Sequence, residues 1–357
     1  MTSVGIVGMG HSLPSVRKND WWPESVTRGW AEMRLKQTLR GRDAPGDLDT
    51  PGARLVKSAM AAAENEDFFG IVERRALGPK EATLGHEVRA AQAALADAGL
   101  TAADIDFVLI HGTLPTWLLI GNGPALHAEL GLPAQIRVVQ VDAGFNSFQA
   151  QLDLARMMIA SGEHQRGLLV QSSGMTKLIA SEDPTSALFG DGATVQVVAA
   201  VSAGRGVLAM AHVTDGSVYG GAVLGNPTRD WWEEGRTTFH IADPARGRKM
   251  FLGAADFASS QVERALAKAG LAPRDVAFFA GHQSTSWFSR TMQQACGLDD
   301  ARSVVTFPYL GNMGASNLPM VLEVGRKEGL LRDGDVVAML AGGSGQNVTG
   351  GVMRWGR

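Results

Sequence analysis

Residues Ala94–His111 read ALADAGLTAADIDFVLIH, and 171 positions later residues Ala265–His282 read ALAKAGLAPRDVAFFAGH, identical at nine positions without a gap. A repeat at half the chain length predicts two similar supersecondary assemblies, because solenoid repeats recur every few tens of residues. Each copy contains an apolar helix that ends at a glycine, Gly99 or Gly270, followed by a short loop and an apolar run. This order is typical of the helix-to-strand part of a βαβ unit, so we predict a duplicated α/β fold.

The composition is that of a compact α/β protein. The chain has 357 residues, 45% hydrophobic residues, 44 glycines and a net charge of −3, which gives no electrostatic reason to bind nucleic acid or an anionic membrane. Cys296 is the only cysteine, which excludes an intrachain disulfide and a cysteine-based metal site, and no metal is expected. No run approaches the roughly 18 apolar residues of a membrane span, and the start MTSVGIVGMG is interpreted as a strand, so we expect a cytoplasmic protein.

Hydrophobic periodicity predicts the individual elements. Strands are expected at Val4–Met9, Phe107–Ile110, Ile136–Val141, Gly167–Gln171, Val195–Ala200, Val336–Leu340 and Val348–Arg354. Helices are expected from Thr83, from about Phe145 to Ala160, and from about Ala254 to Ala269. The second of these carries an apolar stripe, and Asp142 suits its N-cap; the stripe consists of Phe148, Leu152, Ala155 and Ile159.

A long stretch from His11 to about Glu66 carries no recognised motif. It carries three tryptophans together with several cations, among them Arg28, Lys36, Arg40, Arg42, Arg54 and Lys57; the tryptophans are Trp21, Trp22 and Trp30. One interpretation is a surface excursion with a partly buried aromatic anchor. The other is a cap over an active-site mouth, whose cations meet a phosphopantetheine arm, a nucleotide phosphate or an acidic carrier protein.

Five short motifs follow in order along the chain. They are AGFNSF from Ala143, FGDGA from Phe189, GHQS from Gly281, GNMGASN from Gly311 and AGGSG from Ala341. Together they resemble the ketoacyl synthase III branch of the thiolase superfamily, over nearly the whole chain but for an insertion at about residues 20–69. The resemblance implies a thiolase fold, with duplicated βαβαβ halves (1–203 and 204–357) in a five-layered α/β/α/β/α sandwich. It also implies a homodimer that takes acyl groups from CoA or acyl carrier protein.

The nucleophile of the family is missing from its expected place. In the family a cysteine stands at the start of the helix that begins here near Phe145, where the helix N-terminus stabilises a thiolate. A gapless alignment puts Phe145 at that cysteine position, and phenylalanine cannot be acylated. Cys296 is interpreted as a core residue, and Ser147 becomes a nucleophile only after a local register shift.

The two other catalytic positions of the family are filled. His282 and Asn312 match the histidine and asparagine that stabilise an enolate through hydrogen bonds, or the histidine acts as a base on an acceptor. Ser284 and Thr285 replace the Ala-Asn pair that follows the family's His-Gln. We therefore expect the side chains that support His282 to differ from those of the family.

Gly343–Gly345 resembles the glycine-rich turn of the family's oxyanion hole. The resemblance implies that the backbone N–H groups of Phe145 and Gly345 form this hole, which survives loss of the thiol. The alternative is a turn that only joins two core strands.

Two functions are therefore predicted. The first is a ketoacyl synthase III-like acyltransferase or condensing enzyme that works without a cysteine acyl-enzyme, in polyketide or fatty-acid-derived metabolism. Its substrate is an acyl thioester of CoA or of carrier-protein phosphopantetheine, with no permanently bound cofactor. The second is a catalytically inactive partner subunit of a cysteine-bearing ketosynthase, in which Phe145 fills the thiol pocket. Retention of His282 and Asn312 favours the enzyme.

Overall fold

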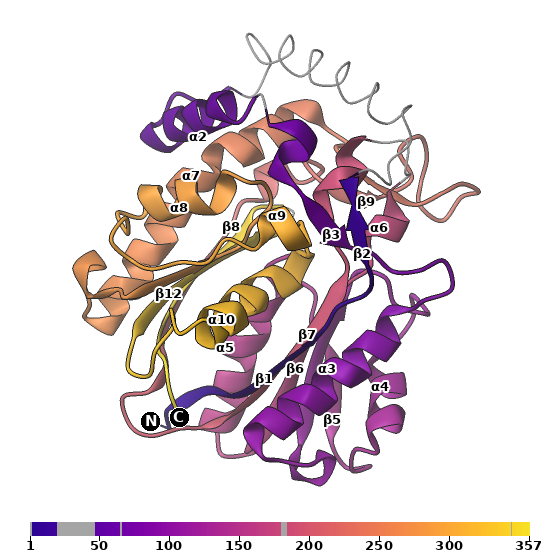
Figure 1. Ribbon diagram of the computed structural model, residues 1–357, viewed down its shortest axis with the longest axis vertical. Helices are drawn as coiled ribbons and strands as arrows, with labels where there is room; N and C mark the ends of the chain where they lie inside the picture. Colours follow the sequence, from indigo (N-terminus) through magenta and orange to yellow (C-terminus); the bar gives the residue numbers. More distant parts are fainter. Residues whose placement is uncertain (1, 20–46, 65, 180–183, 344) are drawn as a thin grey trace.

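Two β-sheets, each covered by helices on both faces, form the body of the protein (Figure 1). The computed structural model describes residues 2–19, 47–64, 66–179, 184–343 and 345–357. Helices on the outside, the two sheets, and two helices between them give the five layers expected of an α/β/α/β/α sandwich. The predicted fold class is therefore confirmed.

The first sheet has the strand order β1-β7-β6-β4-β5. Its strands are β1 (Val4–Ser12), β4 (Phe107–Gly112), β5 (Arg137–Gln140), β6 (Arg166–Ser173) and β7 (Gly192–Ala200). β4 runs parallel to both β5 and β6, and β7 runs antiparallel to both β1 and β6. The outer face is covered by α3 (Thr83–Ala98) and α4 (Gly123–Leu130), and the inner face by α5 (Ser147–Ala160).

The second sheet has the order β11-β12-β13-β8. Its strands are β8 (Gly206–Thr214), β11 (Phe278–Gly281), β12 (Val336–Gly343) and β13 (Asn347–Arg354). β11 and β12 are parallel, and the predicted terminal strand pair β12–β13 is antiparallel. The outer face is covered by α7 (Pro244–Ala269) and α8 (Phe288–Ala295), and the inner face by α10 (Asn317–Lys327). The division of the chain near residue 203 stays a prediction.

Short elements complete the chain. The strand pairs are β2 (Val16–Lys18) with β3 (Glu73–Arg75) and β9 (Val223–Gly225) with β10 (Thr238–His240). The short α-helices are α2 (Pro51–Ala62), α6 (Met175–Leu178) and α9 (Phe307–Leu310). The 3-10 turns are η2 (Asp67–Gly70), η3 (Ala102–Asp104), η4 (Pro184–Leu188), η5 (Gly216–Val218), η6 (Pro273–Asp275) and η7 (Gly314–Ser316). None of the described helices is both long and apolar enough to cross a membrane.

The repeated sequence folds in the same way in both halves. Gly99 ends α3 and Gly270 ends α7, each with a left-handed φ of 68°, a backbone angle that strongly favours glycine. A 3-10 turn follows each glycine, and an aspartate closes it: Asp104 accepts from the Thr101 amide at 2.8 Å, and Asp275 from the Ala272 amide at 2.8 Å. The predicted duplication is confirmed in these two units.

The central layer is the apolar core between the sheets. α5 and α10 pack there against residues of both sheets, among them Phe107 of β4 and Phe278 of β11. The predicted stripe of α5 is fully buried in this cluster; it consists of Phe148, Leu152, Ala155 and Ile159. Because α5 lies between the sheets, its N-terminus faces residues from both halves of the chain.

Two helix boundaries differ from the prediction. α5 begins at Ser147, and its N-cap residue is Asn146; Asp142, expected in that role, instead accepts from the Gly144 amide at 2.9 Å, one turn earlier. α7 begins at Pro244, ahead of the expected Ala254, because its N-cap Asp243 accepts from the Arg246 amide and its first turns are too polar for periodicity to detect.

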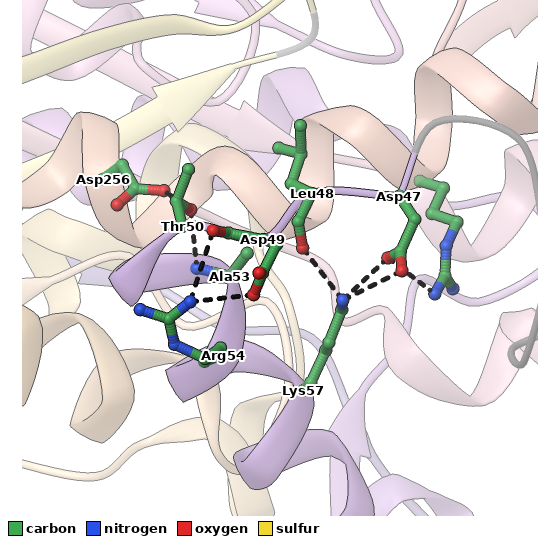
Figure 2. Close-up of polar contacts among 9 residues, drawn as sticks. Asp47, Leu48, Asp49, Thr50, Ala53, Arg54, Lys57 and Asp256 are labelled. Carbon is green, nitrogen blue, oxygen red and sulfur yellow. Dashed lines mark hydrogen bonds and ion pairs between the residues drawn. The ribbon is translucent and has the colours of Figure 1, made fainter.

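The end of the predicted insertion is an ordered helix. α2 docks on α7, where Asp256 accepts from the Gly52 amide at 3.0 Å. Asp256 also accepts from the Thr50 hydroxyl, and Thr50 caps α2 through the Ala53 amide (Figure 2). Arg54 pairs with Asp49 and Lys57 with Asp47, so both cations have acidic partners beside them. The other predicted residues of this insertion lie outside the described residues: Trp21, Trp22, Arg28, Trp30, Lys36, Arg40 and Arg42. The cap over an active-site mouth stays a prediction.

Candidate active site

Three loops bring the predicted site residues together between the two halves. Phe145 precedes α5, His282 follows β11, and Asn312 follows α9. The rings of Phe145 and His282 lie 5.6 Å apart between centroids. A Cβ placed on Gly314 would lie 3.1 Å from the Phe145 ring, and the Gly314 backbone bonds to His282. Phe145, His282 and the turn that begins at Asn312 therefore form one site.

His282 is a buried, neutral imidazole. Only 4% of the residue is exposed, and this burial lowers its pKa from 6.5 to about 4, against a smaller upward effect of the hydrogen bond to Gly314. Its Nδ1 has no partner among the described residues. A ring that is neutral near pH 7 has one nitrogen able to accept a proton.

The Asn312 side chain has a fixed orientation. Its Oδ1 accepts from the Gly314 amide at 2.9 Å and from Asn317 Nδ2 at 3.2 Å. An asparagine amide has one acceptor oxygen and one donor NH₂ group. Since the oxygen is held by the protein, the NH₂ group is the part of Asn312 that remains to donate to a ligand.

Gln283 and Asn317 also support the site, although no role was predicted for either of them. Asn317 Nδ2 also donates to the Gln283 carbonyl at 3.0 Å, which ties the residue after His282 to Asn312. The Gln283 side chain is itself fixed, because its Oε1 accepts from the Phe307 amide at 3.0 Å and its Nε2 donates to the Val304 carbonyl. Both residues lie in the quoted GHQS and GNMGASN motifs, which was the available signal.

Ser284 and Thr285, which differ from the family's Ala-Asn pair, do not disturb the hydrogen bonds of Gln283 and Asn317. Both hydroxyl oxygens are buried and have no partner among the described residues. The support of the His282 loop therefore comes from Gln283 and Asn317, and the two hydroxyls contribute no hydrogen bond to it.

The glycine-rich turn lies against the Phe145 backbone. A Cβ on Gly343 would lie 2.3 Å from the Ala143 carbonyl oxygen and 3.2 Å from the Phe145 nitrogen, so a larger residue would push these backbones apart. The turn also joins β12 to β13, as the alternative interpretation held. Gly345 has a left-handed φ of 72°, and its place in an oxyanion hole stays a prediction.

The two other candidate nucleophiles are occupied or inert. Ser147 is fully buried, and its Oγ donates to the Gly144 carbonyl at 2.6 Å and accepts from the Ala143 amide at 2.9 Å. Cys296 packs in the outer core beside α7, and burial raises the pKa of its thiol to about 12. The interpretation of Cys296 as a core residue is confirmed.

Aromatic side chains surround the Phe145 ring. Phe239 of β10 lies 6.4 Å away and Phe189 lies 6.5 Å away, both between ring centroids. They belong to an apolar cluster with Leu114, Met175, Leu178, Ile179 and Leu188. This side of the site is therefore apolar and packed.

Asp191 of the FGDGA motif has a structural role. Its carboxylate accepts from the Leu77 amide at 2.9 Å and from the Thr176 amide at 3.0 Å. Burial raises its pKa to about 6. The motif is therefore a structural turn that holds the segments at Leu77 and Thr176 together just before β7.

Known proteins with this architecture identify the class and then the family. The structure of 3-oxoacyl-(acyl carrier protein) synthase III from Pseudomonas aeruginosa PAO1 superposes with a TM-score of 0.78 at 24% identity over 99% of both chains. The priming β-ketosynthase of the R1128 polyketide pathway gives 0.79 at 21% identity, over 99% of this chain and 96% of that one. These likenesses place the chain in the class of thiolase-fold proteins.

The sequence relatives are more specific. Beta-ketoacyl-[acyl-carrier-protein] synthase III of Rhodobacter capsulatus is 30% identical over 93% of this chain and 99% of its own length. The enzyme of the same name from Syntrophomonas wolfei is 27% identical over 99% and 98%. Family models of 3-oxoacyl-[acyl-carrier-protein] synthase III match residues 139–216 and, for its C-terminal part, 266–355. The chain belongs to the beta-ketoacyl-[acyl-carrier-protein] synthase III family and is a ketosynthase III-like transferase.

Proposed function

We propose that this chain transfers or condenses acyl groups from a CoA or carrier-protein thioester without forming a cysteine acyl-enzyme. The observation that carries the proposal is the contact between Phe145 and His282, because it puts an unreactive ring at the position where the family's cysteine is expected. The state of Ser147 and Cys296 supports it, since neither is poised as a substitute nucleophile.

The remaining groups suit a direct reaction. Asn312 Nδ2 and the backbone amides of Phe145 and Gly345 donate to the thioester carbonyl as negative charge develops on its oxygen. The acceptor attacks the carbonyl carbon, its proton passes to the neutral His282, and the thiolate of the donor leaves and takes that proton. Because no acyl-enzyme divides the reaction into two steps, both substrates are bound at the same time. Their proximity in the site then accelerates the transfer.

The relatives support a carrier-bound substrate. Their names specify acyl carrier protein, and one structural neighbour is the priming β-ketosynthase of a polyketide pathway. We place this chain in polyketide or fatty-acid-derived metabolism on that basis. The reaction needs no permanently bound cofactor, since the thioester itself brings the activated acyl group.

A second candidate is an inactive partner subunit of a cysteine-bearing ketosynthase. The packing of Phe145 against Phe189 and Phe239 favours it, because an aromatic plug in the thiol pocket suits a subunit that only shapes its partner's site. The fixed donor of Asn312 favours the enzyme, since a scaffold has no need for an oriented amide at this place.

Intact-protein mass spectrometry distinguishes these functions. The purified chain is mixed with acyl-CoA and acyl-carrier thioesters and a panel of acceptors, while free thiol is followed in the same samples. Thiol release without a protein adduct is the expected result. A stable adduct would contradict the proposal, and silence in both readouts would favour the partner subunit.

Phe145→Cys is expected to create an acylation site. The new thiol would stand one residue before the N-cap of α5 and beside His282, where the helix N-terminus stabilises a thiolate. We expect a mass increment of one acyl group after exposure to an acyl thioester, absent from the wild type. Phe145→Ser is the control for pocket opening, and an inert Phe145→Cys protein would show that the pocket does not admit a thioester.

A homodimer is also proposed, and an exposed apolar loop supports it. Trp117, Leu118, Leu119 and Ile120 are 72%, 76%, 82% and 66% exposed, and exposed apolar runs of this kind mark interaction surfaces. These four residues lie in the loop between β4 and α4. β5, the neighbour of β4, is an edge strand of the first sheet and is largely exposed.

Replacing Trp117 and Leu119 together by serine is expected to convert the dimer to a monomer. Light scattering coupled to gel filtration measures the mass directly. The double change Val72→Ser with Tyr309→Ser removes exposed apolar side chains elsewhere and is the matched control. A loop variant that kept the dimer mass would place the interface on another face.

A further inference from the structure

A chain of polar contacts links the protein surface to the start of α5. Asp153 Oδ2 lies 3.1 Å from His212 Nε2, and His212 Nδ1 lies 3.0 Å from Thr349 Oγ1. Asn146 Nδ2 donates to Thr349 Oγ1 at 2.8 Å. Asp153 and Asn146 belong to the first half of the chain, whereas His212 and Thr349 lie on β8 and β13 of the second, so the contacts cross between the halves.

The partners in this chain limit the directions of its hydrogen bonds. A carboxylate only accepts, so Asp153 takes the Nε2–H of His212. In the tautomer that carries its one proton on Nε2, the Thr349 hydroxyl donates to His212 Nδ1, and its oxygen accepts from Asn146. The amide of Asn146 is thus oriented with its NH₂ group towards the second half of the chain.

The second proton of this NH₂ group reaches the glycine-rich turn. Asn146 Nδ2 donates to Asn347 Oδ1 at 2.8 Å, and Asn347 is paired with Gly343 where β12 and β13 meet. The neighbouring Gln346 has a φ of 47°, a left-handed backbone that is strained for a residue other than glycine. Strained turns persist where surrounding contacts hold them, and Asn146 supplies one of these contacts.

The Asn146 side chain does not cap its own helix. Asn146 is the N-cap residue of α5, yet its side chain makes none of the cap hydrogen bonds to the amides of that helix, which asparagine at this position ordinarily makes. The residue is 1% exposed, and its NH₂ group donates to both Thr349 and Asn347, while its Oδ1 has no partner among the described residues. The side-chain hydrogen bonds of Asn146 therefore join the start of α5 to β13, and none of them is made to α5 itself.

We propose that Asn146 is a positioning residue that holds the Phe145 backbone amide in register with Gly343 and Asn347, where β12 and β13 meet, as the two sides of one oxyanion site. Thr349 orients it, and the Asp153–His212 pair orients Thr349. The inference rests on the proposed function, since it assigns Asn146 a role in the same reaction. Phe145 is its direct chain neighbour, and Gly343 already lies against the Phe145 nitrogen.

Asn146→Ser separates positioning from helix stability. Serine is a good N-cap but is too short to reach Asn347, so it offers α5 a side-chain cap that Asn146 does not make, while the contact between the halves is lost. We expect kcat for thiol release to fall by about 10- to 100-fold, the cost of a small misplacement of reacting groups. KM for the thioester should stay within about twofold, because no substrate contact is lost. The melting temperature should stay close to that of the wild type, because the new cap of α5 offsets the hydrogen bonds lost to Asn347 and Thr349.

Two further variants test the same chain of contacts. Thr349→Val removes the hydroxyl while keeping the shape, and is expected to lower kcat by a similar factor. His212→Ala acts one step further away, on a side chain that is 45% exposed, and is expected to lower kcat by only a few fold.

The outcomes separate the two proposals. An active wild type with Asn146→Ser and Thr349→Val both within about twofold of its kcat would overturn the positioning role and leave the proposed function standing. Loss of activity together with a lower melting temperature in both variants would also overturn it, since the residues would then be structural. A wild type silent towards every thioester would overturn the proposed function, and this inference with it.

Discussion

His282→Ala is expected to lower the rate of thiol release by about 10² to 10⁴, the usual contribution of a positioned acid or base. The ring is buried beside Phe145 and Gly314, and its Nδ1 lacks a partner among the described residues. Removing it takes away the acceptor for the nucleophile's proton. The measurement is kcat/KM with a thiol reagent, at saturating acceptor.

The pH profile of the wild type tests the same assignment. Burial lowers the pKa of His282 from 6.5 to about 4, so the ring is neutral above that value and becomes protonated only as the pH falls through it. The acid limb of activity is therefore expected near pH 4, with no inflection near 6.5 from this residue. An acid limb near 6.5 that disappears in His282→Gln would show that the ring is better solvated in the working enzyme. A rate unchanged in His282→Ala would remove the residue from the mechanism.

Local sequence signals predicted the fold well. Gly99 and Gly270 marked two helix ends correctly because the left-handed backbone after a helix strongly favours glycine. The buried stripe of α5 was visible because apolar spacing of three and four residues is a property of one helix alone. The start of α7 was missed, since Asp243 caps a first turn whose exposed residues carry no apolar pattern.

The site was only partly predictable, because its support comes from contacts between distant segments. Phe145, His282 and Asn312 were proposed from motifs, and the structure places the first two in contact. Asn317 bonds to Gln283 across 34 positions, and Asn146 to Asn347 across 201. Such pairs leave no periodicity in the sequence, so only the fold brings them together.

The insertion shows the same limit. Thr50 precedes a helix with Pro51 at its first position, which is a local N-terminal signal, yet the stretch was interpreted as irregular. The partner that fixes this helix is Asp256 on α7, some 200 positions away (Figure 2). Arg54 and Lys57 were considered as phosphate-binding cations, and their pairing with Asp49 and Asp47 depends on how the chain turns before α2.

Asn312→Asp is expected to lower thiol release by about 10² to 10³, the cost of losing one donor to a developing oxyanion. Aspartate keeps the oxygen that accepts from Gly314 and Asn317, so the turn retains both hydrogen bonds. It replaces the NH₂ group with a second acceptor, which cannot donate to a thioester carbonyl and repels negative charge there.

Comparison with Asn312→Ala separates the effect of the NH₂ donor on the rate from the effect of the side chain on stability. Alanine removes the donor and also leaves the Gly314 amide and the Asn317 side chain without their acceptor, so it should lose both activity and thermal stability. If the NH₂ group does the chemistry, the aspartate variant matches alanine in rate while its melting temperature stays closer to the wild type. Should Asn312→Asp keep wild-type activity, the thioester carbonyl would have to be bound by the backbone amides alone, and Asn312 would serve only to hold the turn that carries Gly314 against Phe145.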